Sequence, residues 1–217
     1  MIRTQEEFIE KTDSIVQFSG KTVLEIGCGK GHYTIQLARV AGSVTAIDPD
    51  VESIGIAIRQ NIEDSVYYKL GSAVMLDFQN KSFDIVVFTL SLHHVPDLEM
   101  ITAINEAVRV VKENGYIVFL EPTMEGSCFD AELTFDAFDG DERKEKELAY
   151  KAIISHPHLE HIRELDDRTV FEFDSVEDFI HALQPKINTE QLSDFLSRHN
   201  FALEAKRRIN VCKLIKK

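Results

Sequence analysis

The sequence is poor in the features that mark secreted and membrane-spanning proteins. Its 217 residues include only three cysteines, Cys28, Cys128 and Cys212, which are far apart and odd in number. That pattern argues against a disulfide framework and predicts a reducing, cytoplasmic compartment. No run of about 18 apolar residues occurs, so no membrane-spanning helix is expected. The charged first residues also lack the apolar centre of a signal peptide.

Positive charge is scarce as well. Asp and Glu number 37 against 24 Lys and Arg, and the formal net charge is −13. Proteins that bind nucleic acid need clustered Lys and Arg to neutralise phosphates, and the only basic cluster here lies near the C-terminus. The balance disfavours a nucleic-acid partner and favours a small-molecule substrate, and it leaves the oligomeric state open.

Short apolar runs alternate with amphipathic segments over residues 20–122. Strands are predicted at residues 21–26, 43–48, 65–70, 83–89 and 116–120, and helices at 32–41, 51–62 and 98–111. This alternation, with nearly continuous apolar strands, predicts an α/β fold whose parallel sheet is covered on both faces. A chain of this length is expected to form a single domain with an elaboration.

The elaboration is expected outside that core. Residues 4–7 (TQEE) fit a capping box and predict an N-terminal helix within residues 1–19. Residues 123–188 are charged and lack strong strand signals, so they are expected to form a helical insertion or cap. Residues 189–217 are expected to add a helix and a tight β-hairpin built from residues 201–207 and 209–215.

A glycine-rich turn follows the first predicted strand. Gly27, Gly29 and Gly31 have the spacing G-x-G-x-G. Glycine allows positive φ and lets a ligand approach the backbone closely, and such turns lie where open α/β sheets bind nucleotides. A dinucleotide loop needs a third glycine where His32 stands, and the P-loop pattern is absent. Glu25 would repel a pyrophosphate but suits a ligand that carries an ammonium and a sulfonium.

An acidic residue ends the second predicted strand. Asp48 lies 23 residues after Glu25, where a carboxylate can accept both hydroxyls of an adenosine ribose. The alternative is that Asp48-Pro49-Asp50 forms only a turn and a helix cap. The glycine loop at the neighbouring strand end favours the ligand role.

Several motifs together resemble a known family. Residues 23–31 (VLEIGCGKG) and 46–48 (AID) are similar to the first two motifs of class I S-adenosylmethionine-dependent methyltransferases. Residues 81–88 (KSFDIVVF) and 92–97 (LHHVPD) resemble the fourth-strand motif of the ubiquinone/menaquinone-biosynthesis-like (type 11) branch. Residues 109–116 (RVVKENGY) resemble the helix and glycine turn before strand five. The resemblance covers about residues 20–122, which would form the cofactor-binding core.

The resemblance implies a Rossmann-like, doubly wound sheet of seven strands in the order 3-2-1-4-5-7-6, with the last strand antiparallel. It implies S-adenosylmethionine as the cofactor. The family often has an acid after strand three that reaches adenine; here Ser72 stands there, and its hydroxyl or the Ala73 N–H could bond adenine instead. The candidate cofactor-binding residues are Glu25, Gly27, Cys28, Gly29, Gly31, Tyr33, Asp48, Pro49, Ser72, Ala73 and Thr89.

Methyl transfer is an in-line displacement in which the protein mainly positions the acceptor and excludes water. A base is needed only for an acceptor whose proton has a high pKa. His93 and His94, after the fourth strand, and Glu121, at the end of the fifth, are the candidate catalytic residues, and each also fits a packing or capping role. The cluster of His156, His158 and His161 could bind a transition metal, but a solvated helix start fits it better and no metal is assigned.

The predicted activity is therefore S-adenosylmethionine-dependent methyl transfer (EC 2.1.1) to a small-molecule acceptor. Three alternatives remain. One is another transferase that uses a related donor, such as an aminopropyl transferase. A second is a cofactor-binding protein that has lost transfer. The third is an NAD-dependent oxidoreductase, which His32 and Glu25 disfavour.

Overall fold

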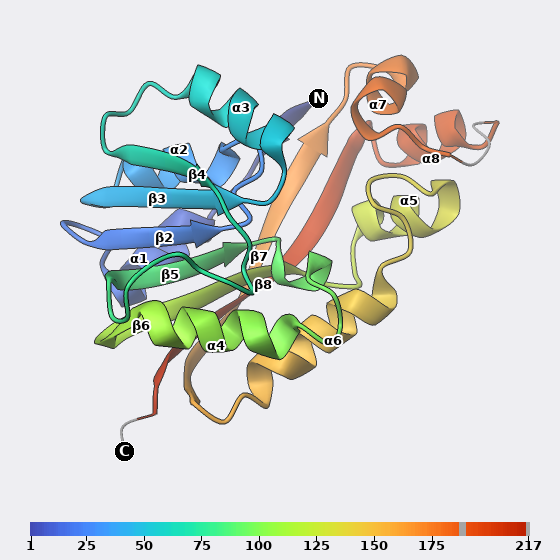
Figure 1. Cartoon of the computed structure of the whole chain (residues 1–217). Coiled ribbons are helices and arrows are strands. Elements are labelled where there is room, and N and C mark those ends of the chain that lie inside the picture. The colour runs from blue at the N-terminus through green and yellow to red at the C-terminus, as the bar shows by residue number, and fades with distance from the viewer. Residues whose placement is uncertain (187–189, 216–217) are drawn as a thin grey trace.

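An eight-stranded mixed sheet runs through the molecule in the computed structural model, which describes residues 1–186 and 190–215 (Figure 1). The strand order is β1-β7-β8-β6-β5-β2-β3-β4. The strands are β1 (Ile2–Thr4), β2 (Thr22–Ile26), β3 (Ser43–Asp48), β4 (Val66–Leu70), β5 (Phe83–Thr89), β6 (Val111–Pro122), β7 (Leu159–Glu172) and β8 (Ala202–Leu214).

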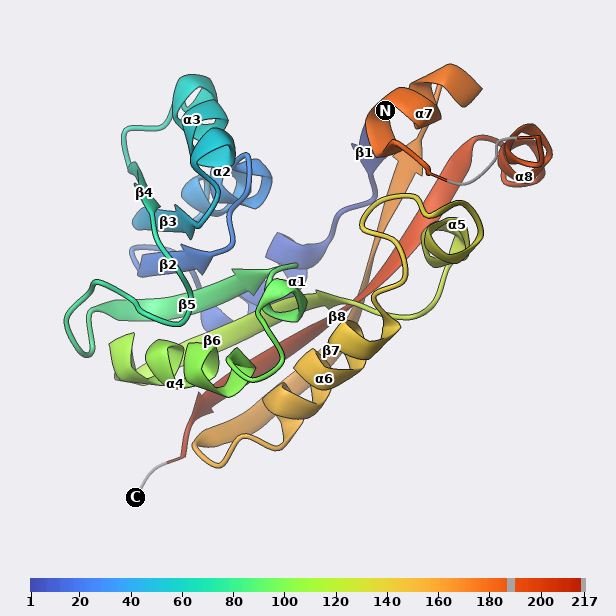
Figure 2. The same ribbon diagram turned by 45° about the vertical axis from the view of Figure 1, so that its right-hand side comes forward.

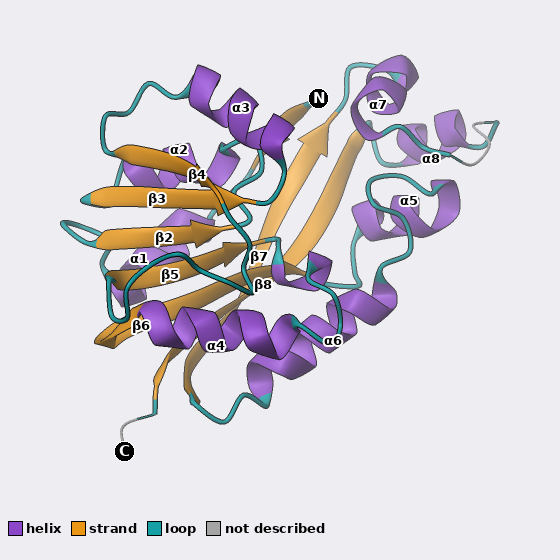
Figure 3. Ribbon diagram, viewed as in Figure 1, coloured by secondary structure: helices purple, strands orange, loops and turns teal. Residues whose placement is uncertain are grey.

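Helices lie on both faces of this sheet (Figure 3). They are α1 (Phe8–Val16), α2 (His32–Ala38), α3 (Val51–Gln60), α4 (Met100–Val110), α5 (Ser127–Phe135), α6 (Arg143–Ile154), α7 (Val176–Leu183) and α8 (Leu192–Arg198), with a short 3₁₀ helix η1 (Leu92–His94). Among the described residues, no helix is long and apolar enough to cross a membrane.

The five strands β4, β3, β2, β5 and β6 are mutually parallel and form the Rossmann-like core. Successive side chains of a strand point to opposite faces. Val86 and Phe88 of β5 therefore pack with α4 and α6, whereas Ile85 and Val87 pack with α1, α2 and α3. Both faces of β5 are buried, which explains its uninterrupted apolar sequence.

The strands beyond β6 correct the predicted positions of the last two strands of the core sheet. β7 forms within the segment expected to be only helical, and β8 is one continuous strand where a hairpin of residues 201–207 and 209–215 was expected. β8 runs antiparallel to both β6 and β7. Arg208, which separates the two predicted strands, stays in register with Glu121 on one side and Asp166 on the other. β7 escaped sequence detection because most of its side chains are exposed and many are charged.

The N-terminus also differs from the prediction. Residues 2–4 form β1, which pairs antiparallel with β7 and makes the sheet eight-stranded rather than seven-stranded. α1 starts only at Phe8, and its cap residue Glu7 makes no side-chain capping bond. Glu6 instead contacts His32, with Oε2 2.8 Å from the ring Nε2. The predicted capping box is therefore wrong, because its residues serve long-range contacts.

A third apolar cluster lies at the far end of β7 and β8. There α5, α7 and α8 gather away from α4 (Figure 2). Phe135, Phe173, Phe179 and Phe195 are buried between them. The insertion and the C-terminal segment thus share a small separate core at one end of the long two-stranded ribbon, while α6 packs against the main sheet.

Candidate functional site

A cavity of about 600 Å³ opens at the carboxyl ends of the parallel strands. Its walls come from residues 27–30 after β2, Asp48 and Pro49 after β3, residues 71–74 after β4 and residues 89–91 after β5. Arg3 from β1 and Asp139 from the insertion also line it. Open α/β sheets bind ligands at this edge, and the volume is typical of a small-molecule site.

The three loop glycines have different neighbours, although all adopt positive φ: +77° at Gly27, +51° at Gly29 and +86° at Gly31. A Cβ at Gly27 would overlap the side chain of Ser91, and one at Gly31 would come 2.6 Å from the Tyr68 hydroxyl. A Cβ at Gly29 would meet nothing within 4 Å. Gly29 is therefore the position where missing side-chain volume opens directly onto the cavity.

Asp48 lines the cavity and also holds the glycine loop. Its Oδ2 accepts the Gly29 N–H at 2.8 Å, and its Oδ1 accepts the Asp50 N–H at 2.9 Å. A carboxylate has about four acceptor sites, so capacity remains for a ligand hydroxyl. The helix cap is the neighbouring Asp50, which accepts the N–H groups of Glu52 and Ser53 at the start of α3.

Glu25 lies beneath the loop and is completely buried. Thr34 donates its hydroxyl to one oxygen at 2.5 Å, and Thr89 donates to the other at 2.9 Å. Burial raises the pKa of Glu25 to about 7, although both hydroxyl bonds oppose the shift. Thr89 lines the cavity and Glu25 does not, so Glu25 acts on the cavity through its charge and through Thr89.

Most of the other predicted cofactor residues line the cavity, and one does not. Cys28, Tyr33, Pro49, Ser72 and Ala73 line the cavity. Gly31 does not line it. Burial raises the pKa of the Cys28 thiol well above its usual range, which does not suit a nucleophile. Ser72 and Ala73 follow β4. They are the residues that the sequence motifs suggest for an adenine contact.

Two of the candidate catalytic residues, Glu121 and His93, contact each other after β5. Glu121, at the end of β6, accepts the backbone N–H groups of Ser91, Leu92 and His93 at 3.2, 2.9 and 3.3 Å. Its Oε2 also lies 2.5 Å from the His93 Nδ1. Both side chains are buried, and neither lines the cavity. Their contacts position η1.

His94 is the predicted catalytic residue that does face the cavity. Its side chain is 48% exposed, and its Nδ1 lies 3.3 Å from Oε1 of Glu142. The carboxylate of Glu142 raises the pKa of His94. Sequence reasoning missed Glu142, Arg3 and Asp139, because they reach the site from the insertion and from the edge strand, where no motif marks them.

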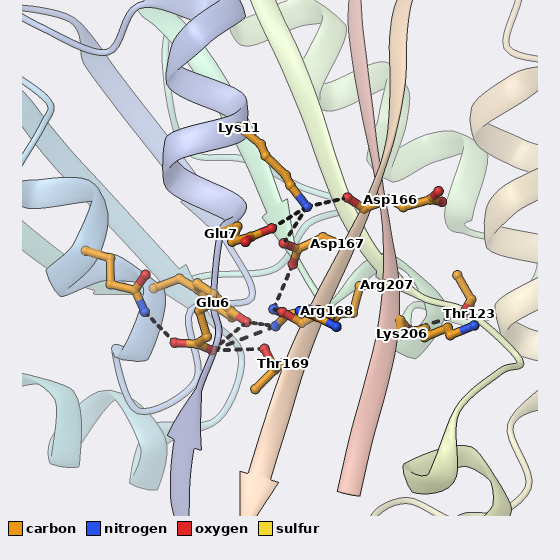
Figure 4. A network of polar contacts seen from close by, with 12 residues as sticks. Glu6, Glu7, Lys11, Thr123, Asp166, Asp167, Arg168, Thr169, Lys206 and Arg207 are labelled. Atoms are coloured by element: carbon orange, nitrogen blue, oxygen red, sulfur yellow. Dashed lines mark hydrogen bonds and ion pairs between the residues drawn. The ribbon is translucent and has the colours of Figure 1, made fainter.

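A buried polar network joins Glu6, Asp167 and Arg207 (Figure 4), and it reaches the cavity through Tyr33. Arg207 of β8 pairs with Asp167 of β7 at 2.7 Å and lies 3.8 Å from Glu6. The same guanidinium donates to the Tyr33 hydroxyl. Burial raises the pKa of Tyr33 to about 12. The network ties the N-terminal segment and the β7–β8 ribbon to one wall of the cavity.

The second histidine cluster of the sequence does not converge. His156 Nδ1 accepts the His158 N–H at 3.4 Å, while His161 Nε2 lies 3.2 Å from the carbonyl oxygen of Ile153. Within residues 1–186 and 190–215, the group of three residues spaced closely enough to hold a metal ion is His93, His94 and Glu142.

Comparison with known proteins agrees with this geometry. Residues 24–119 match the family described as methyltransferase domain. A ubiquinone biosynthesis O-methyltransferase of Hydrogenovibrio crunogenus is 37% identical over 52% of this chain and 46% of its own length. A demethylmenaquinone methyltransferase of Bacillus licheniformis is 36% identical over 47% and 45%. The chain thus spans about half the length of the curated relatives it matches.

Solved structures share the fold over nearly the whole chain. A putative methyltransferase from Bacillus halodurans superposes with a TM-score of 0.65 at 17% identity, covering 94% of this chain and 97% of that one. Over residues 24–119 the chain is thus similar to the methyltransferase-domain family and to methyltransferases named for ubiquinone and menaquinone synthesis.

Proposed function

We propose that the protein transfers the methyl group of S-adenosylmethionine to a small-molecule acceptor. The observation that carries the proposal is the pairing of Gly29 and Asp48 at one cavity. Gly29 leaves its wall open, and Asp48 keeps free acceptor capacity beside it. Bound S-adenosylmethionine supplies an activated methyl group on a sulfonium.

The chain's residues would hold the two halves of the cofactor separately. Asp48 would accept the ribose hydroxyls, and Ser72 with the Ala73 N–H would bond the adenine edge. The backbone at Gly29 would approach the methionine part. Ionised Glu25, below the loop, would favour the positive charge of the cofactor, which a pyrophosphate ligand lacks. These assignments support S-adenosylmethionine over NAD.

The acceptor end of the cavity would lie toward His94, Val95 and Pro96, which line the cavity together with Asp139 and Arg3. In the transfer, an acceptor atom forms a bond to the methyl carbon while the carbon–sulfur bond breaks and its electron pair stays on sulfur. The protein would align the acceptor and exclude water. The relatives are named for quinone biosynthesis. For this chain we propose only that the acceptor is a small molecule. From the cysteine content we also propose a cytoplasmic location.

Calorimetry with S-adenosylmethionine, S-adenosylhomocysteine and NAD tests the donor assignment directly. We expect micromolar binding of the first two and no heat with NAD. Incubation with methyl-labelled S-adenosylmethionine and a panel of small hydroxyl and amine compounds then tests transfer. Binding of NAD alone would overturn the proposal, whereas tight binding of S-adenosylhomocysteine without transfer to any compound would favour the binding-protein alternative.

A further inference from the structure

Three potential metal ligands meet beside the cavity. They are His93 and His94 of η1 and Glu142, the residue just before α6. One ligand atom from each lies within 4.8 Å of the other two. The carboxylate of Glu142 reaches both rings: Oε1 is 3.3 Å from His94 Nδ1, and Oε2 is 3.8 Å from His93 Nε2. Ligands bound tetrahedrally at about 2.0–2.1 Å lie about 3.3 Å apart, so small movements would complete the shell.

Glu121 prepares His93 to be a ligand. A carboxylate only accepts hydrogen bonds, so the 2.5 Å contact with Glu121 places the proton on His93 Nδ1. In the neutral ring Nε2 is then bare, and it faces Glu142. Metal-ligating histidines usually donate their other N–H to a carboxylate in this way, which fixes the ring and raises its basicity.

His93 Nε2 lies 3.8 Å from Glu142 Oε2. With the His93 proton on Nδ1 and Glu142 ionised, both atoms present lone pairs to each other. His93 is 4% exposed and Glu142 17%, so water does not easily separate them. A cation between these atoms would satisfy both.

Negative charge exceeds positive charge around the three groups. Lys146 is nearly buried and lies 3.9 Å from Glu142, and its closer contact is to Glu132, at 2.5 Å. Asp139 adds a further carboxylate that acts electrostatically on His94. Four carboxylates, those of Glu121, Glu132, Glu142 and Asp139, thus lie around the two histidines and Lys146, a balance that favours a divalent cation.

We propose that His93, His94 and Glu142 bind a divalent transition-metal ion such as Zn²⁺. Two imidazoles and one carboxylate are the protein ligands of several catalytic zinc sites and suit Mg²⁺ and Ca²⁺ poorly. His94 and Asp139 both line the cavity, so the remaining coordination position faces it. If the proposed function holds, that position would take an oxygen of the acceptor and favour acceptors with an ionisable hydroxyl.

Titration of the metal-stripped protein with Co²⁺ and Zn²⁺ tests the site without any acceptor. We expect one equivalent to bind, with visible Co²⁺ absorption typical of low coordination number, and no comparable binding of Mg²⁺. Removing an outer-shell partner of a ligating histidine usually weakens metal binding about 10–100-fold. We expect Glu121→Gln to fall in that range and His93→Ala and Glu142→Gln to lose more.

His158→Ala is the matched control, because it removes a histidine from the cluster that does not converge. It should leave metal affinity unchanged. His94→Ala, at a half-exposed position, provides a ligand variant with little risk to folding. S-adenosylhomocysteine affinity measured on every variant separates the two proposals, since it should stay within a few-fold of wild type even where metal binding is lost. Absence of stoichiometric binding by the wild type, or full binding by His94→Ala and Glu142→Gln, would overturn the metal site.

Discussion

Gly29 and Gly20 offer a comparison that separates backbone strain from ligand contact. Both have positive φ, +51° and +71°, and a Cβ added at either would meet nothing within 4 Å. They lie beyond opposite ends of β2, and only Gly29 lines the cavity. Alanine at either position therefore introduces a comparable backbone penalty, but only at Gly29 does the methyl group occupy ligand space.

The expected magnitudes differ between stability and binding. A non-glycine residue in the left-handed region costs about 1–2 kcal/mol, partly offset by about 0.4–1 kcal/mol from the less flexible unfolded chain. Both variants should thus unfold a few degrees below wild type. Overpacking by one methyl costs about 1–3 kcal/mol, so Gly29→Ala should bind S-adenosylhomocysteine roughly 5–150-fold more weakly.

Thermal unfolding and calorimetry on the three proteins provide both quantities. Gly20→Ala should show the same loss of thermal stability as Gly29→Ala with unchanged S-adenosylhomocysteine affinity. If the two variants bound the ligand equally well, Gly29 would shape only a turn, and the cofactor would have to lie elsewhere.

Two further predictions concern buried charges. The folded-state pKa of Glu25 is raised to about 7 from 4.5, so its contribution to stability is present below pH 4.5 and is lost as pH rises through 7. Glu25→Gln should remove up to roughly 3 kcal/mol of this pH dependence; equal slopes of unfolding free energy against pH in both proteins would contradict the assignment. Arg207→Met removes the nearest charge partner of the buried Asp167 carboxylate, which keeps only Lys11 at 3.9 Å, and should destabilise the fold by about 3–5 kcal/mol. The control Arg208→Met, whose ion pair to Glu164 is partly exposed, should cost at most about 1 kcal/mol in urea unfolding, and similar losses in both variants would show that burial of the pair is not the cause.

Local sequence patterns determined the core of this protein. β5 was predicted with its observed bounds, and β2, β3 and β4 to within a residue, because burial on both faces requires apolar runs of strand length. The positions of Gly29 and Asp48 at the cavity also followed from sequence. Gly29 follows one predicted strand and Asp48 ends the next, and the carboxyl ends of these strands meet at one edge.

Only the tertiary structure decided the rest. β7 is largely exposed and charged, so its strand character depends on pairing with β8. β1 forms against a partner 166 to 170 positions away in sequence. Glu121 meets His93 across 28 residues, and Glu142 reaches His94 from a segment with no recognisable motif. The local sequence around each of these residues does not identify its partner. The partners meet only because the folded sheet brings distant segments together.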